Sequence, residues 1–233
     1  MTEPTSPRRM VALLPMKAHS QRVPGKNFRE LVTKPLYKWI LDTLLSIPEI
    51  DLILVNTDAD HILKESGFTE SSRVKLRRRK EELCGDMVSM NLILADDIAA
   101  VPADAYLMTH TTNPLLSAQT IRNAIHAFEK GIKDRSADSL FTVTKRQTRF
   151  YRADGSAVNH DPNNLLRTQD LEPWFEENSN LYLFSRSSFE KTNARIGAKP
   201  ILFETNKIES SDIDDPEDWD IAEALARRQL EQA

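Results

Sequence analysis

Short apolar runs alternate along this chain with longer segments of helical period. The predicted strands are Val11–Leu14, Leu52–Asn56, Val74–Leu76, Ala105–Thr109, Leu140–Thr144, Leu181–Phe184 and Ile201–Phe203. Between them, Leu36–Leu45, Met87–Ala99 and Thr120–Phe128 carry apolar residues at spacings of three and four, which is typical of helices with one face on a sheet. The alternation predicts an α/β protein with three layers and a mostly parallel sheet.

The C-terminal segment carries strong signals for a further helix. Asp215 suits the N-cap position and Pro216 the first helical position, and the acidic residues Glu217 and Asp218 follow in the first turn. Carboxylates in the first turn face the positive end of the helix dipole. The sequence therefore predicts a helix that starts directly after Asp215.

Residues 145–177 break the alternation, because they are polar, contain Pro162 and Pro173 and show no regular period. A segment of this length is too long for an ordinary connection. We expect an inserted lid, binding excursion or oligomerisation arm, with a disordered loop as the alternative. The remaining chain divides into a flexible tail at residues 1–9 and one domain formed by residues 10–144 and 178–233.

Composition limits the class of protein. The 233 residues are 40% hydrophobic and 28% charged, which is typical of a soluble globular protein. No run of about eighteen apolar residues is present, and Val11 to Pro15 is too short for a signal-peptide core, so we expect a cytoplasmic protein without a membrane partner. The single cysteine, Cys84, excludes an intramolecular disulfide and a multi-cysteine metal site.

A basic loop follows the first predicted strand. Lys17, Arg22 and Lys26 lie within ten residues of one another, with Ser20 between them. Cations at the carboxyl end of a parallel strand are suited to a polyphosphate, although neither a Walker nor a Gly-x-Gly-x-x-Gly spacing is present. The alternative is a solvated basic loop.

Two acidic residues precede the C-terminal helix. Side chains two positions apart in an extended segment face the same way, so Asp212 and Asp214 can present carboxylates to one hard cation such as Mg²⁺. The alternative is that both residues cap the helix. That role fits Asp215, but Asp212 lies too far ahead of the helix.

These segments resemble the acylneuraminate cytidylyltransferases, the CMP-sialic acid synthetase family. Residues 17–27 are similar to the nucleotide loop of that family, Pro-Ala-Arg-x-x-Ser-x-x-(Ile/Leu)-Pro-x-Lys-Asn. Further similarities follow in the family's order at residues 56–58, 79–83, 109–115, 178–182 and 212–214. The resemblance covers roughly residues 10 to 225. It implies a Rossmann-like nucleotidyltransferase fold.

The resemblance also implies a reaction and a set of nucleotide contacts. A 2-keto-3-deoxy sugar acid and CTP would give the CMP-sugar and pyrophosphate, with Mg²⁺ as cofactor. Lys17 and Lys26 would hold phosphates and act in catalysis together with Asp214. Arg22 and Ser20 would contact the nucleotide as well. Asn27 and Arg79 would lie beside the cytidine.

Further residues are implied for the sugar and for assembly. His110, Asn178 and Tyr182 would line the sugar site, and Asp212 would join Asp214 at the metal. The family uses the inserted region as an arm exchanged in a homodimer, so Gln169 would reach the sugar of a partner subunit. The same resemblance implies a role in making cell-surface polysaccharide.

Several departures from the family pattern affect the sugar more than the chemistry. Lys17 replaces an arginine that would grip phosphate with a planar fork, and His110 replaces a glutamine. Ser179 and Asn180 replace a small Gly-Ala pair. The alternatives are a CMP-octulosonate synthetase, whose signatures are missing here, and a nucleotide-binding homologue that has lost catalysis.

An RNA-binding module is a third class of function, suggested by the basic run Arg77–Lys80 with Arg73 before it. The net charge of −4, from 31 basic and 35 acidic residues, and the lack of interleaved aromatic residues argue against a nucleic-acid partner.

Overall fold

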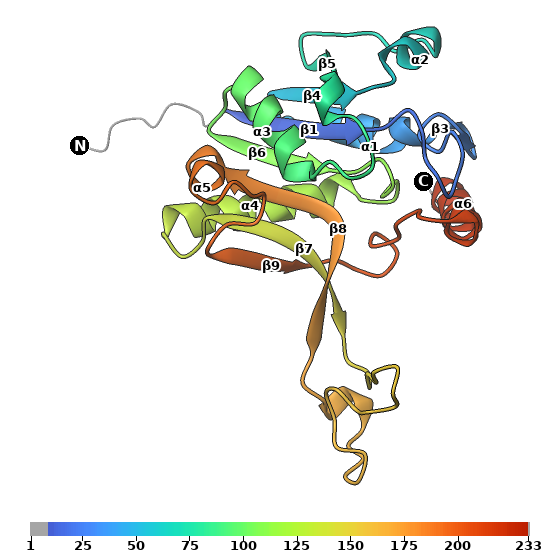
Figure 1. Ribbon diagram of the computed structural model, residues 1–233, viewed down its shortest axis with the longest axis vertical. Coiled ribbons are helices and arrows are strands. Elements are labelled where there is room, and N and C mark those ends of the chain that lie inside the picture. Colours follow the sequence, from blue (N-terminus) through green and yellow to red (C-terminus); the bar gives the residue numbers. More distant parts are fainter. Residues whose placement is uncertain (1–8, 233) are drawn as a thin grey trace.

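The computed structural model describes residues 9–232, and a single large sheet organises this part of the chain (Figure 1). Its strands are β1 (Met10–Met16), β4 (Leu52–Thr57), β5 (Val74–Arg78), β6 (Ala105–Thr109), β7 (Ser139–Arg146), β8 (Trp174–Ser185) and β9 (Pro200–Glu204). Within the described residues the order is β5-β4-β1-β6-β8-β7-β9, and every neighbouring pair is parallel except those made by β8. The predicted mostly parallel sheet is confirmed.

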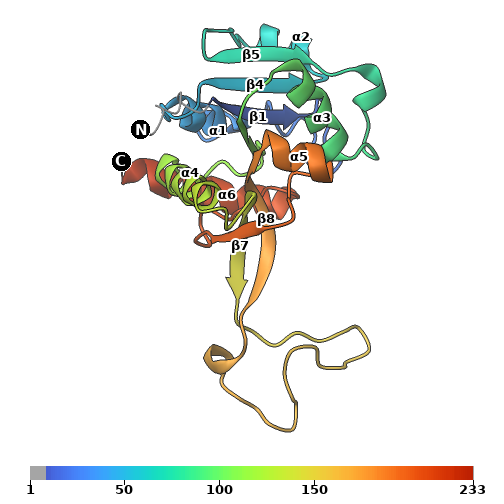
Figure 2. The same cartoon turned by 90° about the vertical axis from the view of Figure 1, so that its left-hand side faces the viewer.

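Helices cover both faces of this sheet. They are α1 (Leu36–Leu45), α2 (Asp60–Glu65), α3 (Met90–Ala100), α4 (Ala118–Lys133), α5 (Arg186–Thr192) and α6 (Pro216–Glu231). Along β1, Ala12 and Leu14 pack with α1 and α4, whereas Val11 and Leu13 pack with α3 and α5. Figure 2 shows α1 and α4 on one side of the sheet and α3 and α5 on the other. Because strand side chains alternate between faces, β1 is buried on both sides and the predicted three layers are confirmed.

The sequence pattern missed the shortest elements. These are α2, α5, the two-residue strands β2 (Glu30–Leu31) and β3 (Lys34–Pro35), and the 3₁₀ turns η1 (Glu81–Leu83) and η2 (Thr168–Asp170). The two helices have six and seven residues, fewer than two turns, and the strands and 3₁₀ turns have two or three residues, so none of them shows a clear periodicity. The predicted helix Met87–Ala99 also starts too early, because α3 begins at Met90 and Met87 is 98% exposed in the preceding loop.

The C-terminal helix is capped as the sequence predicts. The Asp215 side chain accepts a hydrogen bond from the backbone N–H of Asp218 at 3.0 Å, and the Asp218 carboxylate accepts from the N–H of Asp215 at 3.1 Å. Trp219 is buried in a small apolar cluster with Trp39 of α1 and Ile213. This packing fixes the segment that precedes α6 beside the loop that follows β1.

The inserted segment is a two-stranded ribbon that carries a loop at its end (Figure 1). The register places Lys145 opposite Phe175 and Arg146 opposite Trp174, so β7 and β8 extend beyond the sheet. The predicted limits at 145 and 177 therefore fall inside strands, and only residues 147–173 are irregular apart from η2. Strand pairing, rather than an apolar period, gives the ends of this segment their structure.

The start of the described chain is anchored to the sheet. The backbone N–H of Arg9 donates to Asp104 at 2.9 Å, and the Arg9 carbonyl accepts from the N–H of Asp104 at 3.0 Å. The other residues of the predicted tail lie outside the described residues. Among the residues that are described, no helix is both long and apolar enough to cross a bilayer.

Candidate functional site

A cavity of about 460 Å³ opens at the carboxyl end of β1, where the loop after β1, the end of β6 and the segment before α6 meet. Ligands of open α/β sheets bind at this edge. The predicted site residues that line it are Lys17, Ser20, Arg22, Lys26, Asn27, Arg79, His110, Asp212 and Asp214. The tertiary structure thus brings the basic loop and the acidic pair of the sequence into one site.

Two cations of the loop face Asp214. The Arg22 Nη2 atom lies 2.8 Å from the Asp214 Oδ1 atom, and the Lys26 Nζ atom lies 3.9 Å from the same oxygen. Lys26 also donates to the Ile213 carbonyl and is nearly buried. Burial lowers the pKa of Lys26, and the nearby carboxylates of Asp214 and Asp212 oppose that shift. Lys26 is therefore held in place inside the cavity, between the Ile213 carbonyl and the Asp214 carboxylate.

Lys17 meets an acidic residue that sequence reasoning missed. Its Nζ atom donates to Asp86 at 2.9 Å, and Gln21 donates to the other carboxylate oxygen at 2.6 Å. The hydrogen bond from Lys17 holds the pKa of Asp86 below its ordinary value. Asp86 lies in the loop before α3 and also lines the cavity, but no local motif marks it.

The Asn27 side chain fastens the loop to the sheet. Its Nδ2 atom donates to the Lys17 carbonyl at 2.7 Å, and its Oδ1 atom accepts from the Thr111 hydroxyl at 2.6 Å. Because both ends of the amide contact the protein, Asn27 shapes the loop in this structure.

Asp212 is the more buried member of the acidic pair. Burial raises its pKa above the ordinary value, and a hydrogen bond from Thr112 and the charge of Lys26 act in the opposite direction. Its Oδ1 atom is buried and has no hydrogen-bond partner among the described residues. Such an orphaned carboxylate oxygen is suited to a cation.

The donor set of this pair limits the metal that fits. Among residues 9–232, no cluster of three or more His, Cys, Asp or Glu side chains forms a protein-only metal cage. Mg²⁺ commonly takes one or two protein carboxylates together with substrate phosphates and water. Asp212 and Asp214, beside three cations suited to phosphate, fit that arrangement.

His110 follows β6 at the base of the cavity. Burial lowers its pKa to about 4, with further lowering by the charges of Arg195 and Lys26. The imidazole is therefore neutral near pH 7 and can both donate and accept a hydrogen bond.

A second, polar cavity of about 610 Å³ adjoins the first and runs toward the base of the ribbon. Ser179, Asp212 and Asp214 line both cavities. Asn178 lines the second one, and its Nδ2 atom donates to the Thr205 hydroxyl at 2.7 Å. The arrangement provides room for a second substrate directly beside the acidic pair.

A bulge in β8 shapes the wall between the cavities. The β7–β8 register passes from Phe141 opposite Tyr182 to Val143 opposite Glu177, so several residues of β8 bulge out. Ser179 lies in this bulge with a left-handed φ of 57°, a conformation that favours glycine. The resembling family has glycine at this position.

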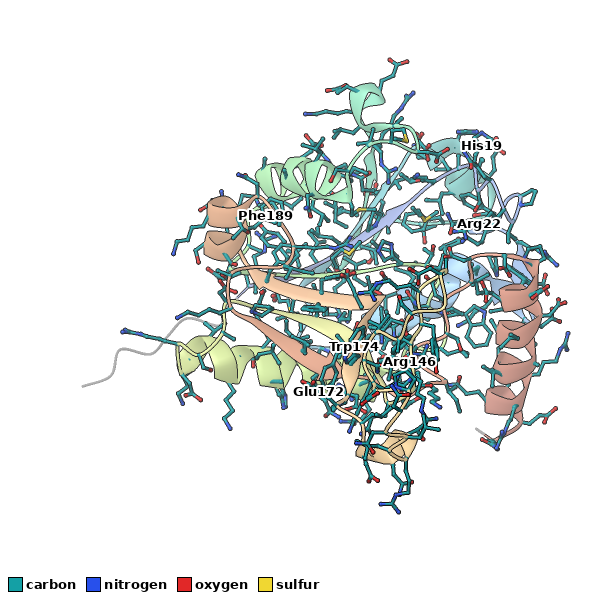
Figure 3. All side chains as sticks on the ribbon, turned by 60° about the horizontal axis from the view of Figure 1, so that its bottom comes forward. His19, Arg22, Arg146, Glu172, Trp174 and Phe189 are labelled. Carbon is teal, nitrogen blue, oxygen red and sulfur yellow. The ribbon has the colours of Figure 1, made fainter. Side chains whose placement is uncertain are left out.

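Arg146 lies on the other side of the second cavity, at the base of the ribbon. It pairs with Glu176 at 2.8 Å, and both residues line that cavity. Figure 3 shows Arg146 together with Trp174 of the opposite strand, well apart from His19 and Arg22 of the loop that follows β1.

Tyr182 and Gln169 are not brought into either cavity. The Tyr182 hydroxyl donates to Glu177 and accepts from Arg195 at 3.1 Å, and burial raises its pKa to about 12. Arg195, which sequence reasoning missed, also lies over the Tyr182 ring at 4.0 Å. Gln169 belongs to η2 at the far end of the ribbon, where its carbonyl accepts from Gln147 at 3.1 Å.

Comparison with known sequences gives a consistent result. Residues 11–232 match the family described as cytidylyltransferase. An N-acylneuraminate cytidylyltransferase of Oncorhynchus mykiss is 27% identical over 95% of this chain and 51% of its own length. A CMP-N,N'-diacetyllegionaminic acid synthase of Legionella pneumophila is 28% identical over 93% of this chain and 96% of its own length. The chain thus spans about half of the fish protein and nearly all of the bacterial one.

Solved structures show the same fold at low identity. A CMP:2-keto-3-deoxy-manno-octonic acid synthetase complexed with CTP has a TM-score of 0.66 and 14% identity, covering 95% of this chain and 99% of that one. A 4-diphosphocytidyl-2C-methyl-D-erythritol synthase of Anaerococcus prevotii has a TM-score of 0.65 and 15% identity, covering 94% and 96% of the two chains.

Proposed function

Because this chain belongs to the cytidylyltransferase family through residues 11–232, we propose that it activates a sugar acid with CTP and releases pyrophosphate. The acceptor is a 2-keto-3-deoxy acid of the nonulosonic, sialic-acid-like class. Relatives named for neuraminic and legionaminic acids support this choice. The carrying observation is the cavity in which Lys17, Arg22 and Lys26 meet Asp212 and Asp214 beside a second, polar cavity.

The reaction is an in-line attack by the anomeric hydroxyl of the acid on the α-phosphorus of CTP. Lys17, Arg22 and Lys26 bind the triphosphate and neutralise the charge that develops on the leaving pyrophosphate. Ser20 adds a hydrogen-bond donor, and Arg79 contacts the cytosine. Since the protein forms no covalent bond to the phosphorus, positioning of the two substrates supplies much of the rate enhancement.

Asp212 and Asp214 are the residues that would hold Mg²⁺, which supplies Lewis-acid neutralisation of phosphate oxygens when bound. The buried, unpartnered Oδ1 atom of Asp212 supports this assignment. Arg22, which pairs with Asp214 at 2.8 Å, would be available to the triphosphate when Asp214 holds the cation. Asp212 and Asp214 thereby orient the nucleotide at the border between the two cavities.

The second cavity is proposed as the acceptor site. Asn178 lines it and is held by its amide hydrogen bonds to the hydroxyls of Thr205 and Ser210, and Ser179 forms the wall shared with the nucleotide cavity. His110 contributes a neutral hydrogen-bonding edge next to the acidic pair. The bulge in β8 sets the shape of this wall and therefore affects which acid is accepted.

We also propose a homodimer in which the ribbon reaches a partner subunit. Tyr151 and Leu165 on the ribbon loop are 54% and 69% exposed, and Gln169 lines neither of the two cavities described above. An arm that extends from the body and exposes apolar side chains is suited to a twofold contact. Gln169 would then reach the sugar bound by the partner. A reaction that consumes CTP suits the cytoplasm, and its product suits the assembly of cell-surface polysaccharide.

A CMP-octulosonate synthetase is the second candidate, supported by the fold similarity to the octonic acid synthetase at a TM-score of 0.66. The deciding experiment measures pyrophosphate release with CTP, Mg²⁺ and a panel of 2-keto-3-deoxy acids of eight and nine carbons. Turnover of a nine-carbon acid supports the proposal, and turnover of only the eight-carbon acid favours the second candidate. CTP binding without turnover of any acid would indicate a homologue that has lost catalysis.

A further inference from the structure

A buried polar chain leads from helix α3 to the wall of the nucleotide cavity. Asp97 of α3 is completely buried, and its Oδ1 atom accepts a hydrogen bond from Asn56 Nδ2 at 2.6 Å. The Oδ1 atom of Asn56, at the end of β4, accepts in turn from Arg79 Nε at 2.8 Å. Arg79 is the member of this chain that lines the cavity.

The chemistry of the end groups fixes the orientation of the amide between them. A guanidinium can only donate hydrogen bonds, and an ionised carboxylate can only accept them. Asn56 must therefore point its oxygen toward Arg79 and its nitrogen toward Asp97. A reversed amide would leave two donors facing each other at Arg79 and two acceptors facing each other at Asp97.

The same contacts fix the plane of the Arg79 guanidinium. Its Nη2 atom donates to the carbonyls of Met16 at 3.0 Å and Asn56 at 3.1 Å. Nε and Nη2 are thus occupied within the protein, whereas no hydrogen bond from Nη1 is found among the described residues. The guanidinium keeps donors for a ligand in the cavity that Arg79 lines.

Burial of the Asp97 carboxylate destabilises the fold, so packing alone does not explain why this position holds an acid. Burial raises its pKa to about 6, opposed by the hydrogen bond from Asn56 and the charges of Arg77 and Arg79, while Asp96 adds to the rise. Arg77 Nε lies 3.2 Å from Asp97 Oδ1 without hydrogen-bond geometry, and the Oδ2 atom of Asp97 has no hydrogen-bond partner within residues 9–232. An apolar residue would fill this position on α3 at lower cost.

We propose that Asp97 is a positioning residue for base recognition, which acts through Asn56 to aim Arg79 at the pyrimidine of the bound nucleotide. The inference rests on the proposed function, because it takes CTP as the ligand. Cytosine presents acceptors at O2 and N3, whereas uracil carries an N–H at N3. A fixed guanidinium donor therefore favours cytosine, and a loosely held one discriminates less.

The test compares CTP and UTP binding by titration calorimetry for wild type, Asp97→Leu and Asp97→Asn. Asp97→Leu should weaken CTP binding about tenfold, the effect of one charge-assisted hydrogen bond, with UTP affinity little changed. Asp97→Asn keeps an acceptor for Asn56 and should stay within about threefold of wild type. In the proposed reaction, Asp97→Leu should raise KM for CTP and leave kcat nearly unchanged.

A matched control distinguishes the loss of Arg79 positioning from a general destabilisation of α3. Leu94 is buried on the same helix, and Leu94→Ala should lower stability without changing the preference for CTP over UTP. Should Asp97→Leu not fold, the double variant Asn56→Leu/Asp97→Leu removes both partners of the Asn56–Asp97 hydrogen bond, so that only Arg79 Nε in this polar chain loses its acceptor. It should lose the CTP preference in the same way.

The outcomes are distinct. CTP affinity of Asp97→Leu or of the double variant within twofold of wild type overturns the inference, and so does an equal loss for CTP and UTP. The same loss of preference in Leu94→Ala also overturns it. A wild-type protein that binds neither nucleotide overturns the proposed function and this inference together.

Discussion

The guanidinium of Arg22 and the carboxylate of Asp214 form an ion pair at 2.8 Å on the rim of the nucleotide cavity. In the proposed reaction Arg22 binds the triphosphate and Asp214 binds the metal. A cation that takes Asp214 frees Arg22 for phosphate, and a phosphate that takes Arg22 frees Asp214 for the cation. The pair therefore links the binding of the nucleotide to the binding of Mg²⁺.

The variant Asp214→Asn should lower turnover about 10- to 100-fold and preserve the fold, because an amide is a poorer ligand than a carboxylate for a hard dication. Rates measured against Mg²⁺ concentration should show a higher Mg²⁺ requirement and partial recovery at excess metal. Glu217→Gln, which changes a nearby exposed acid in the first turn of α6, is the matched control. A wild-type rate for Asp214→Asn at limiting Mg²⁺ would contradict the metal assignment.

The variant Lys26→Met should weaken CTP binding and also slow the chemical step, because the buried cation matters more as pyrophosphate leaves. Loss of a charge-assisted contact corresponds to about 1.5–3 kcal/mol, or roughly ten- to hundredfold in affinity. Calorimetry and steady-state kinetics measure the two effects separately. Lys34→Met, a change at a lysine paired with Asp42 away from the cavity, should leave both unchanged. A change under twofold for Lys26→Met would mean that the loop is not the phosphate site.

The variant Ser179→Gly should raise the free energy of unfolding by up to about 1 kcal/mol, because Ser179 has a left-handed φ of 57° that a side chain disfavours. Loss of the contact between the Tyr182 and Ser179 hydroxyls, at 3.3 Å, offsets part of the gain. Urea denaturation measures the change. Ser187→Gly, near the start of α5, should instead lower stability. A destabilised Ser179→Gly protein would show that the hydroxyl contact outweighs the backbone strain.

The pH dependence of the free energy of unfolding should reveal the titration of the Asp97 carboxyl group. Its pKa is about 6 in the folded protein and near 3.8 when unfolded, so the folded state binds more protons between these values and stability falls as pH rises. The decrease from this group between pH 4 and pH 7 amounts to about 2 kcal/mol. Asp97→Asn should lack this component when denaturation curves of the two proteins are compared across that range. Parallel pH profiles for the two proteins would show that Asp97 titrates normally.

Removal of residues 149–172, with the strand ends of the ribbon joined by a short Gly-Ser linker, tests the composite site. We expect monomers by light scattering that keep CTP affinity, because the nucleotide cavity belongs to one chain, but lose activity toward the sugar acid. Gln169→Ala in the intact ribbon should stay dimeric and raise KM for the sugar alone. An intact wild-type protein that is monomeric and fully active would contradict the composite site and leave the ribbon as a lid.

The features that the sequence predicted correctly are local ones. The buried strand Val11–Leu14 is a continuous apolar run. The adjacent residues Asp215 and Pro216 mark the N-cap and the first residue of α6. Lys17, Arg22 and Lys26 lie close together in the chain directly after that strand, so the edge of the sheet that they occupy followed from the predicted topology. Each of these signals depends on residues a few positions apart.

Other parts of the candidate site depended on the tertiary structure. Lys17 and Asp86 are 69 residues apart in sequence, and Asn56 and Asp97 are 41 residues apart. Contacts at such separations are set by how strands and helices pack, and neither acid has a recognisable neighbouring motif.

The ribbon shows the same division between sequence and tertiary structure. The pattern marked residues 145–177 as irregular, whereas pairing of Arg146 with Trp174 extends both strands into that segment. Strand pairing is decided by the opposite strand rather than by a residue's own neighbours in sequence. The sequence by itself therefore determined the order of the elements, the capped helix and the charged segments. Only the tertiary structure decided which charges meet in the cavity and where β8 bulges, because those depend on residues brought together by folding.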